Sequence, residues 1–168
     1  MTAQDTPIIP SASRHCCFLV GGDCFAVPSA SVAEVLRDGR ITRVPHAPEA
    51  VLGLLHLRGR IVPVIDMRRR LGFPVSILSA NPTHLVLRLH DDWYSLLVDE
   101  MLDVIEVPAD SIEHPSQPAA DTPHDAVVGV FAGASQLVHF LDPQRIVQLP
   151  GRQREQFIHK QGATHGGF

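Results

Sequence analysis

The chain has 168 residues, a length that suits one domain or two very small ones. Apolar residues make up 45% of it and charged residues 19%, as in globular rather than disordered proteins, and the formal net charge of −4 argues against a basic nucleic-acid binder. No apolar run approaches the roughly 18 residues that would span a membrane. We therefore expect a soluble, cytoplasmic protein that is not inserted in the membrane and does not bind nucleic acid.

The first element predicted along the chain is a β-hairpin. Residues 1–13 are rich in Pro, Ser and Ala, and we expect them to be flexible. The short apolar runs 16–20 and 24–27 follow, separated by Gly21-Gly22-Asp23. Two such runs around a glycine-rich turn predict paired antiparallel strands.

A short helix and a short strand are expected next. Ser31 is followed three residues later by Glu34, which is the spacing of a capping box, so residues 32–36 are predicted to be helical. Residues 41–44 have the composition of a strand, and Pro45 ends it.

A second hairpin is predicted from the apolar runs 54–57 and 61–66, which flank a glycine-containing turn. Pro63 lies within the second run and cannot donate a hydrogen bond to a neighbouring strand, so we expect an edge strand or a bulge there. Residues 67–71 are predicted to form a helical turn, with Asp66 as its N-cap.

The second half of the chain continues the pattern of short strands. The elements expected there are strands at 84–89, 93–98, 102–107, 127–131 and 136–141, a proline-rich loop at 114–124, a helical turn at 143–149 and a short helix at 152–161. Short strands at such regular spacing, with little helix, indicate a barrel or a sandwich.

The predicted architecture is mainly β, with two small five-stranded β-barrels that share one core and carry short helical turns. The loop at 78–82 separates two halves of similar size, each large enough for a barrel. The expected boundaries are a flexible segment at 1–13, one domain at 14–150 with subdomains at about 20–80 and about 83–148, a first strand at 15–19 that could belong to either, and a tail at 151–168.

The chain lacks common catalytic motifs, since it contains no G-x-S-x-G, no P-loop and no G-x-G-x-x-G. His15, Cys16, Cys17 and Cys24 lie close together, which leaves open a small metal-binding or ligand-binding barrel built on the first hairpin. We favour packed side chains, because Cys16 and Cys17 face opposite sides of a strand and the spacing is not that of a zinc site. No catalytic residue, cofactor or metal is expected.

Charge is distributed unevenly along the chain. Residues 37–70 hold eight Arg against three acidic residues, whereas residues 90–125 hold ten acidic residues and no Lys or Arg. The run Arg68-Arg69-Arg70 is expected to be a solvated face, although a small ligand or an oligonucleotide on the basic half is a weaker alternative. If the two segments lie on different faces, weak head-to-tail self-association is expected at low salt.

Residues 57–68, Leu-Arg-Gly-Arg-Ile-Val-Pro-Val-Ile-Asp-Met-Arg, strongly resemble the signature N-L-R-G-x-x-x-P-V-x-D-L-R of the CheW family, the coupling proteins of bacterial chemosensory arrays. The resemblance extends over about residues 15–149, with His56 in place of the signature's Asn. It implies two packed SH3-like five-stranded barrels and a non-enzymatic adaptor without a cofactor. It also implies two partners at the inner face of the membrane, the cytoplasmic tip of a methyl-accepting chemoreceptor and the regulatory domain of a CheA-type histidine kinase. The pathway would be chemotaxis or an alternative one, such as surface sensing or twitching.

The same resemblance implies a receptor-binding site in a groove between the barrels. The positions that match the family's receptor-binding positions are Val32, Glu34, Gly53 and Arg58. Arg58, at a hairpin end, is expected to hydrogen-bond carboxylate or carbonyl groups of the receptor tip. Gly53 would let a backbone come close, and an apolar slot would be lined by Val32, Val51 and Leu54.

Overall fold

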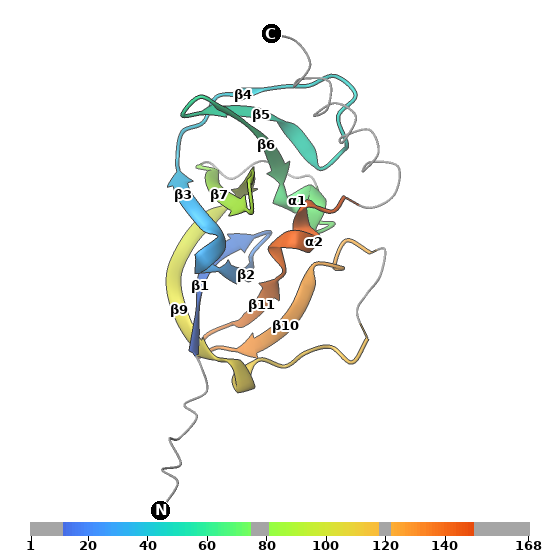
Figure 1. Ribbon diagram of the computed structural model, residues 1–168. Coiled ribbons are helices and arrows are strands. Elements are labelled where there is room, and N and C mark those ends of the chain that lie inside the picture. Colours follow the sequence, from blue (N-terminus) through green and yellow to red (C-terminus); the bar gives the residue numbers. More distant parts are fainter. Residues whose placement is uncertain (1–11, 75–80, 118–121, 150–168) are drawn as a thin grey trace, which may run out of the picture.

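The computed structural model describes residues 12–74, 81–117 and 122–149, so the helix expected at 152–161 lies outside the described residues. The strands are β1 (Ala12–Val20), β2 (Asp23–Pro28), β3 (Val32–Leu36), β4 (Ile41–Thr42), β5 (Val51–Leu57), β6 (Arg60–Asp66), β7 (Thr83–Leu89), β8 (Asp92–Val98), β9 (Glu100–Pro108), β10 (Val127–Ala132) and β11 (Leu137–Leu141). Two short α-helices, α1 (Met67–Arg70) and α2 (Pro143–Val147), lie side by side near the middle of the molecule (Figure 1). Within the described residues, no helix has the length and apolar character needed to cross a membrane.

The strands form two sheets, stacked one above the other in Figure 1. The lower sheet has five strands in the order β10-β11-β2-β1-β9, and the upper sheet has six in the order β3-β7-β8-β6-β5-β4. The sixth strand, one more than expected, is β3, which stands where a helix was expected and pairs with β7. The predicted all-β class with short helical turns is thus the observed one.

Each sheet takes strands from both sides of the loop expected to divide the chain at 78–82. The first hairpin, β1–β2, pairs with β9 and β11, and the hairpin β7–β8 pairs with β3 and β6. The first and second halves of the sequence therefore do not form one sheet each, because the N-terminal hairpin crosses to the strands of the second half.

The helix predicted at residues 32–36 is wrong, since this segment is the strand β3. It pairs with β7, and its exposure alternates from residue to residue, as expected of a strand with one inward face. The preceding residues Ser29–Ser31 form a single 3-10 turn without a side-chain cap. The Glu34 carboxylate accepts hydrogen bonds from Arg58 instead of capping this turn, so the capping-box spacing does not mark a helix here.

The predicted hairpins are confirmed as β1–β2, β5–β6, β7–β8 and β10–β11. The strand expected at 41–44 is limited to β4. Pro63 lies in β6, which is an interior strand rather than an edge, and the bulge of this hairpin is in the partner strand, between Val51 and Gly53. The missing N–H of Pro63 is tolerated because the parallel ladder to β8 begins only at Val64.

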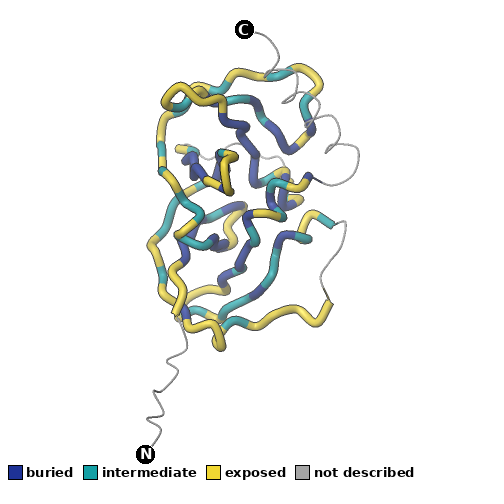
Figure 2. Tube along the Cα trace, in the orientation of Figure 1, coloured by how far each residue is buried: buried dark blue, intermediate teal, exposed yellow. Residues whose placement is uncertain are grey.

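The core predicted to be shared by the two barrels is present, and each sheet also encloses a smaller cluster of its own. The central core contains buried residues of both sheets, among them Phe18, Phe25, Ile65, Leu85 and Leu96. The lower sheet closes around Cys17, Cys24, Ala26, Val107, Val138 and Phe140. The upper sheet closes around Leu55, Val62, Val64 and Leu97. Figure 2 shows the buried chain concentrated where the sheets meet.

A buried polar pair lies inside the upper sheet. The Nδ1 atom of His84 on β7 is 2.9 Å from the Oγ of Ser95 on β8, and both side chains are buried. Burial lowers the pKa of His84 below its ordinary value of 6.5, because the apolar surroundings disfavour the imidazolium form.

This pKa shift predicts that the protein loses stability as the pH falls below about 6.5. Below that pH the unfolded chain binds a proton at His84 that the folded chain does not. The free energy of unfolding is therefore highest above the unfolded-state pKa of His84 and declines as the pH falls below it. Urea denaturation at pH 7.5, 6.5 and 5.5 measures the effect, whose slope for one proton is at most about 1.4 kcal/mol per pH unit. A His84→Asn variant, which keeps a hydrogen-bonding group without titrating, should show a shallower decline than the wild type. An identical pH profile for the variant and the wild type would contradict the assignment to His84, whereas His56→Asn, at an exposed position, serves as the control.

Candidate functional site

The tip of the β5–β6 hairpin determines how Arg58 is presented. Arg58 and Gly59 are the two central residues of the turn, with φ angles of 50° and 76°. Two consecutive positive φ angles define a type I′ turn, whose twist matches that of the flanking strands. Glycine adopts a positive φ without strain, whereas a positive φ is uncommon for a residue with a side chain such as Arg58. The Arg58 side chain is 72% exposed as a result, as expected for a hairpin end.

Arg58 is bound to Glu34, so two residues predicted separately for the site meet in the structure. The Nε and Nη2 atoms of Arg58 donate to the two carboxylate oxygens of Glu34, at 3.0 and 2.9 Å. This bidentate hydrogen bonding lowers the pKa of Glu34 and raises that of Arg58. Because β3 is an edge strand and the turn joins β5 to β6 near the other edge, the ion pair also shows that the upper sheet curls on itself.

The other predicted site residues divide into two groups. Val51 is buried in the central core, and a Cβ on Gly53 would lie 2.4 Å from the backbone oxygen of Thr42. The backbone that comes close to Gly53 is thus β4 of the same chain. Val32 and Leu54 are half-buried, so they are the two apolar positions that a partner could still reach.

Arg60 and Trp93 form a contact at this end of the upper sheet that sequence patterns did not predict. The guanidinium carbon of Arg60 lies 4.9 Å from the centroid of the Trp93 ring, within the range of a cation–π interaction. Arg60 begins β6, directly after the turn that carries Arg58, and Trp93 lies near the start of β8. The only signal in the sequence is that Trp93 is the single Trp of the chain, which does not identify its neighbour.

The expectation that residues 68–70 form a solvated face holds only for Arg69, which is exposed, and is wrong for Arg68 and Arg70. Each arginine of α1 is paired with a carboxylate. Arg68 donates from Nε and Nη2 to Asp99, at 2.8 and 2.9 Å. Asp99 also accepts a hydrogen bond from the backbone N–H of Gly21, in the turn of the first hairpin. Asp66 accepts from the backbone N–H groups of Arg68 and Arg69, as predicted for the N-cap of this turn.

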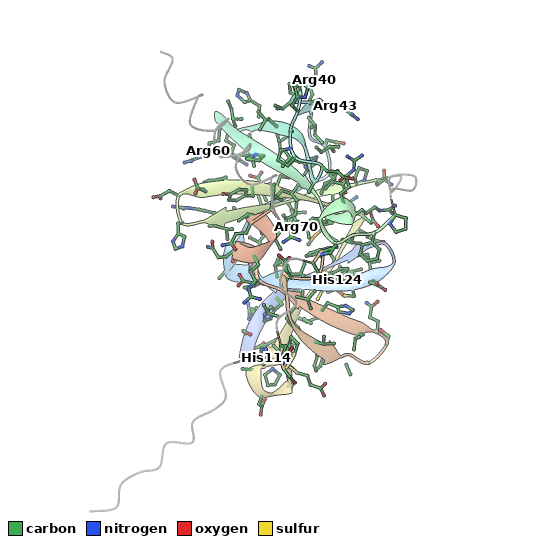
Figure 3. All side chains as sticks on the ribbon, turned by 90° about the vertical axis from the view of Figure 1, so that its right-hand side faces the viewer. Arg40, Arg43, Arg60, Arg70, His114 and His124 are labelled. Atoms are coloured by element: carbon green, nitrogen blue, oxygen red, sulfur yellow. The ribbon has the colours of Figure 1, made fainter. Side chains whose placement is uncertain are left out.

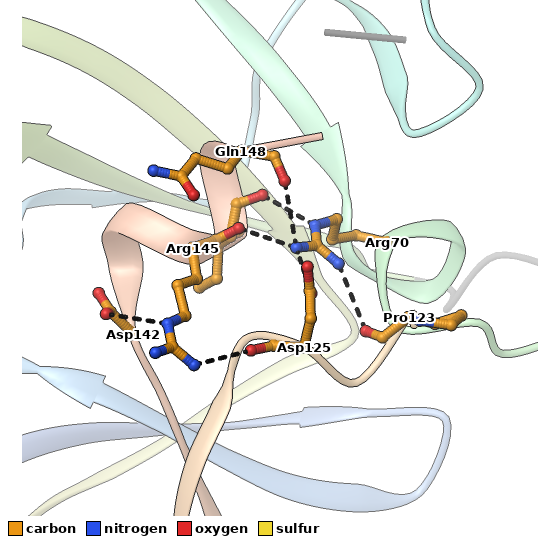
Figure 4. A network of polar contacts seen from close by, with 7 residues as sticks. Arg70, Pro123, Asp125, Asp142, Arg145 and Gln148 are labelled. Atoms are coloured by element: carbon orange, nitrogen blue, oxygen red, sulfur yellow. Dashed lines mark hydrogen bonds and ion pairs between the residues drawn. The ribbon is translucent and has the colours of Figure 1, made fainter. Parts of the chain in front are cut away.

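Arg70 is the most deeply buried of these arginines, with a side chain only 1% exposed. It forms an ion pair with Asp125 at 2.7 Å. Its guanidinium also donates to backbone carbonyl oxygens, namely those of Pro123, Arg145, Ile146 and Gln148 (Figure 4). An arginine of the upper sheet's helix thereby binds the carbonyl groups around α2 and the segment before β10, both attached to the lower sheet.

The cysteines of the first hairpin are packed side chains on two different faces. Cys16 belongs to the central core, whereas Cys17 and Cys24 belong to the core of the lower sheet, as the alternation of a strand predicts. Burial raises the pKa of Cys17 to about 12 and also raises that of Cys24, so both are neutral thiols at physiological pH. In the described part of the chain, no group of three or more His, Cys, Asp or Glu residues could hold a metal ion.

Comparison with known proteins gives one consistent result. A family model described as "CheW-like domain" matches residues 14–150. The chain is 28% identical to chemotaxis protein CheW of Rhizobium meliloti, over 82% of this chain and 88% of that protein. It is 32% identical to protein PilI of Pseudomonas aeruginosa, over 68% of this chain and 64% of that protein. Its fold is similar to the crystal structure of scaffolding protein TtCheW from Thermoanaerobacter tengcongensis, with a TM-score of 0.75, 24% identity, and coverage of 85% of this chain and 97% of that chain. The predicted architecture of two SH3-like barrels is confirmed by this likeness.

Proposed function

The chain belongs to the CheW-like domain family, and from this we propose that it is a non-enzymatic adaptor that couples methyl-accepting chemoreceptors to a CheA-type histidine kinase. Proteins of this family are coupling and scaffold proteins of chemotaxis systems. The proposed role places the chain in the cytoplasm, held at the inner face of the membrane by the receptor arrays. Regulation would then act through contacts that favour one conformation of the kinase.

The observation that carries the proposal is the turn that presents Arg58 at the end of the upper sheet. The turn lies within the segment that resembles the family signature, and the ion pair with Glu34 fixes the side chain in one orientation. Val32, at the start of β3, and Leu54, on β5, add half-buried apolar surface on two strands of the same sheet. A fixed arginine and apolar surface on one sheet suit the packed helical tip of a receptor.

Isothermal titration calorimetry of the whole chain tests the proposal. The titrants are the regulatory domain of each CheA-type kinase, and a soluble cytoplasmic fragment of each chemoreceptor, encoded in the same genome. We expect a dissociation constant of about 1 μM for one kinase and one receptor fragment, corresponding to roughly −8 kcal/mol. Absence of binding to every kinase and every receptor would refute the adaptor role.

The identity of the kinase that binds also decides the pathway. The relatives of this chain include CheW proteins of chemotaxis and the proteins PilI and FrzA. We infer a role in chemotaxis or in an alternative pathway such as surface sensing or twitching. The metal-binding alternative gains no support from the described cysteines, which lie on two faces of one hairpin.

Weak self-association through charge is a separate prediction. Among the described residues, four of the eight arginines at 37–70 form ion pairs, and the other four, Arg37, Arg40, Arg43 and Arg60, are exposed. Figure 3 shows Arg40 and Arg43 at the far end of the upper sheet. Exposed acidic residues lie along β9, an edge strand of the lower sheet. Sedimentation velocity should show concentration-dependent association at ~20 mM salt that disappears at about 150 mM, where the Debye length is about 8 Å. Equal sedimentation at both salt concentrations would contradict it.

A further inference from the structure

We propose that Arg60, supported by Trp93, is the residue of this hairpin that binds a carboxylate on the cytoplasmic tip of the receptor. This inference rests on the adaptor function proposed above and assigns a chemical specificity to the same end of the upper sheet. The position of Arg60 is left open in the family signature that the segment resembles, so the contact is a property of this chain rather than of that signature.

Arg58, in the turn, and Arg60, directly after it, differ in how many of their guanidinium N–H donors are free to bind a partner. Arg58 already donates two hydrogen bonds to the Glu34 carboxylate, which offsets its charge. Arg60 is exposed, and among the described residues its side chain makes no hydrogen bond or ion pair. Within the described part of the chain, its guanidinium contacts the Trp93 ring, which attracts the cation but accepts none of its N–H groups in the plane of the guanidinium. Arg60 therefore retains the full donor set that a carboxylate requires.

The Trp93 contact also orders the Arg60 side chain before a partner arrives. A free arginine loses rotamer entropy when a partner fixes it, and an aromatic ring that already holds the guanidinium reduces this loss on binding. Trp93 is half-buried and packs against the core of the upper sheet, so it is a rigid support. Arginine and tryptophan are also the residue types most often found at binding hot spots.

The neighbouring acidic residues do not satisfy Arg60. Asp91 and Asp92 lie at the adjacent β7–β8 turn, yet among the described residues neither forms an ion pair with it. Their negative charge close to the site disfavours a highly acidic surface as the partner. A single Asp or Glu on a helical tip, presented between apolar neighbours, is the chemistry that fits. A receptor is favoured over the kinase because Arg60 shares its turn with Arg58.

The test is calorimetry of the whole chain against the soluble receptor fragment that binds the wild type. Arg60→Gln is expected to weaken receptor binding at least tenfold, and Arg60→Lys to recover only part of the loss, because a lysine cannot form a bidentate contact. Trp93→Leu, which preserves the net charge, should weaken binding several-fold. Arg14→Gln, at an exposed position on β1 of the lower sheet, changes net charge equally and should leave affinity unchanged. Circular dichroism and thermal unfolding establish that each variant is folded.

The receptor carboxylate is identified by replacing each acidic residue of the fragment with its amide. One replacement should weaken binding to the wild type as much as Arg60→Gln does, and should have no further effect on that variant. Wild-type affinity in the folded Arg60→Gln variant would overturn the assignment while leaving the adaptor function intact. A loss confined to the kinase regulatory domain would overturn it in favour of a kinase contact. If the wild type bound no receptor fragment, both this inference and the receptor half of the proposed function would fail.

Discussion

Replacement of Arg70 by Met is expected to lower the free energy of unfolding by about 3 kcal/mol. The buried guanidinium binds Asp125 and carbonyl oxygens around α2, and methionine removes the donor from each of these contacts. The carbonyl oxygen of Arg145 keeps the backbone N–H of Gln148, whereas the Asp125 carboxylate loses its ion-pair partner. Breaking a buried ion pair from one side costs about 3–5 kcal/mol, and the lower value applies because Asp125 is still 23% exposed to water. Chemical denaturation followed by circular dichroism measures the change.

The same helix provides the matched control for this substitution. Arg69 is adjacent to Arg70 and is also paired with an aspartate, but its side chain is 34% exposed. Arg69→Met should therefore cost less than about 1 kcal/mol. Arg70→Lys should restore little, because one ammonium group cannot reach acceptors spread over the same arc. Equal stabilities of the two methionine variants would show that the Arg70 network contributes nothing beyond an ordinary surface pair.

Replacement of Arg58 by Ala is expected to abolish receptor binding, with a loss of at least tenfold in affinity, while the fold is retained. The side chain is at the exposed tip of a hairpin and contributes nothing to the buried cores, so the alanine variant should keep the wild-type circular dichroism spectrum and cooperative unfolding. Calorimetry with the receptor fragment gives the affinity. Unchanged receptor affinity, or a loss of folded structure, would defeat the assigned role.

Glu34→Gln separates the position of Arg58 from its charge. Glutamine keeps one acceptor for the guanidinium but removes the bidentate pair, so Arg58 gains mobility without losing its charge. Receptor affinity should fall by less than in Arg58→Ala. The kinase regulatory domain is the reference titrant, because its affinity should be the same for the wild type and both variants.

The parts of the fold that sequence predicted well are those determined by local patterns. Glycine-centred turns between apolar runs located the hairpins β1–β2 and β5–β6, and Asp66 before an apolar-to-basic segment marked the cap of α1. The helix prediction for residues 32–36 failed for a physical reason. A capping-box spacing shows only that a helix is locally possible, and pairing with β7 stabilises a strand there instead. Local pattern also could not show that the first hairpin joins strands of the second half.

For the candidate site, the sequence suggested residues but did not reveal what each of them contacts within the chain. Glu34 and Arg58 were both expected, and their direct ion pair depends on the curl of a six-stranded sheet that no local spacing reveals. Val51 and Gly53 were expected to meet a receptor, whereas one faces the central core and the other faces β4. The arginines of α1 look alike in sequence, and only tertiary packing makes Arg70 internal.

The exchange of strands between the two halves of the sequence has a consequence for how the chain folds. The parallel pairing of β2 with β11 joins Cys24 to Val138, residues separated by most of the chain. Closing so long a loop is entropically costly, and topologies rich in such distant contacts fold slowly. On the ribosome, the lower barrel is complete only after β11 has been synthesised. Until then the first hairpin can pair with β9 on one side but lacks β11 on the other.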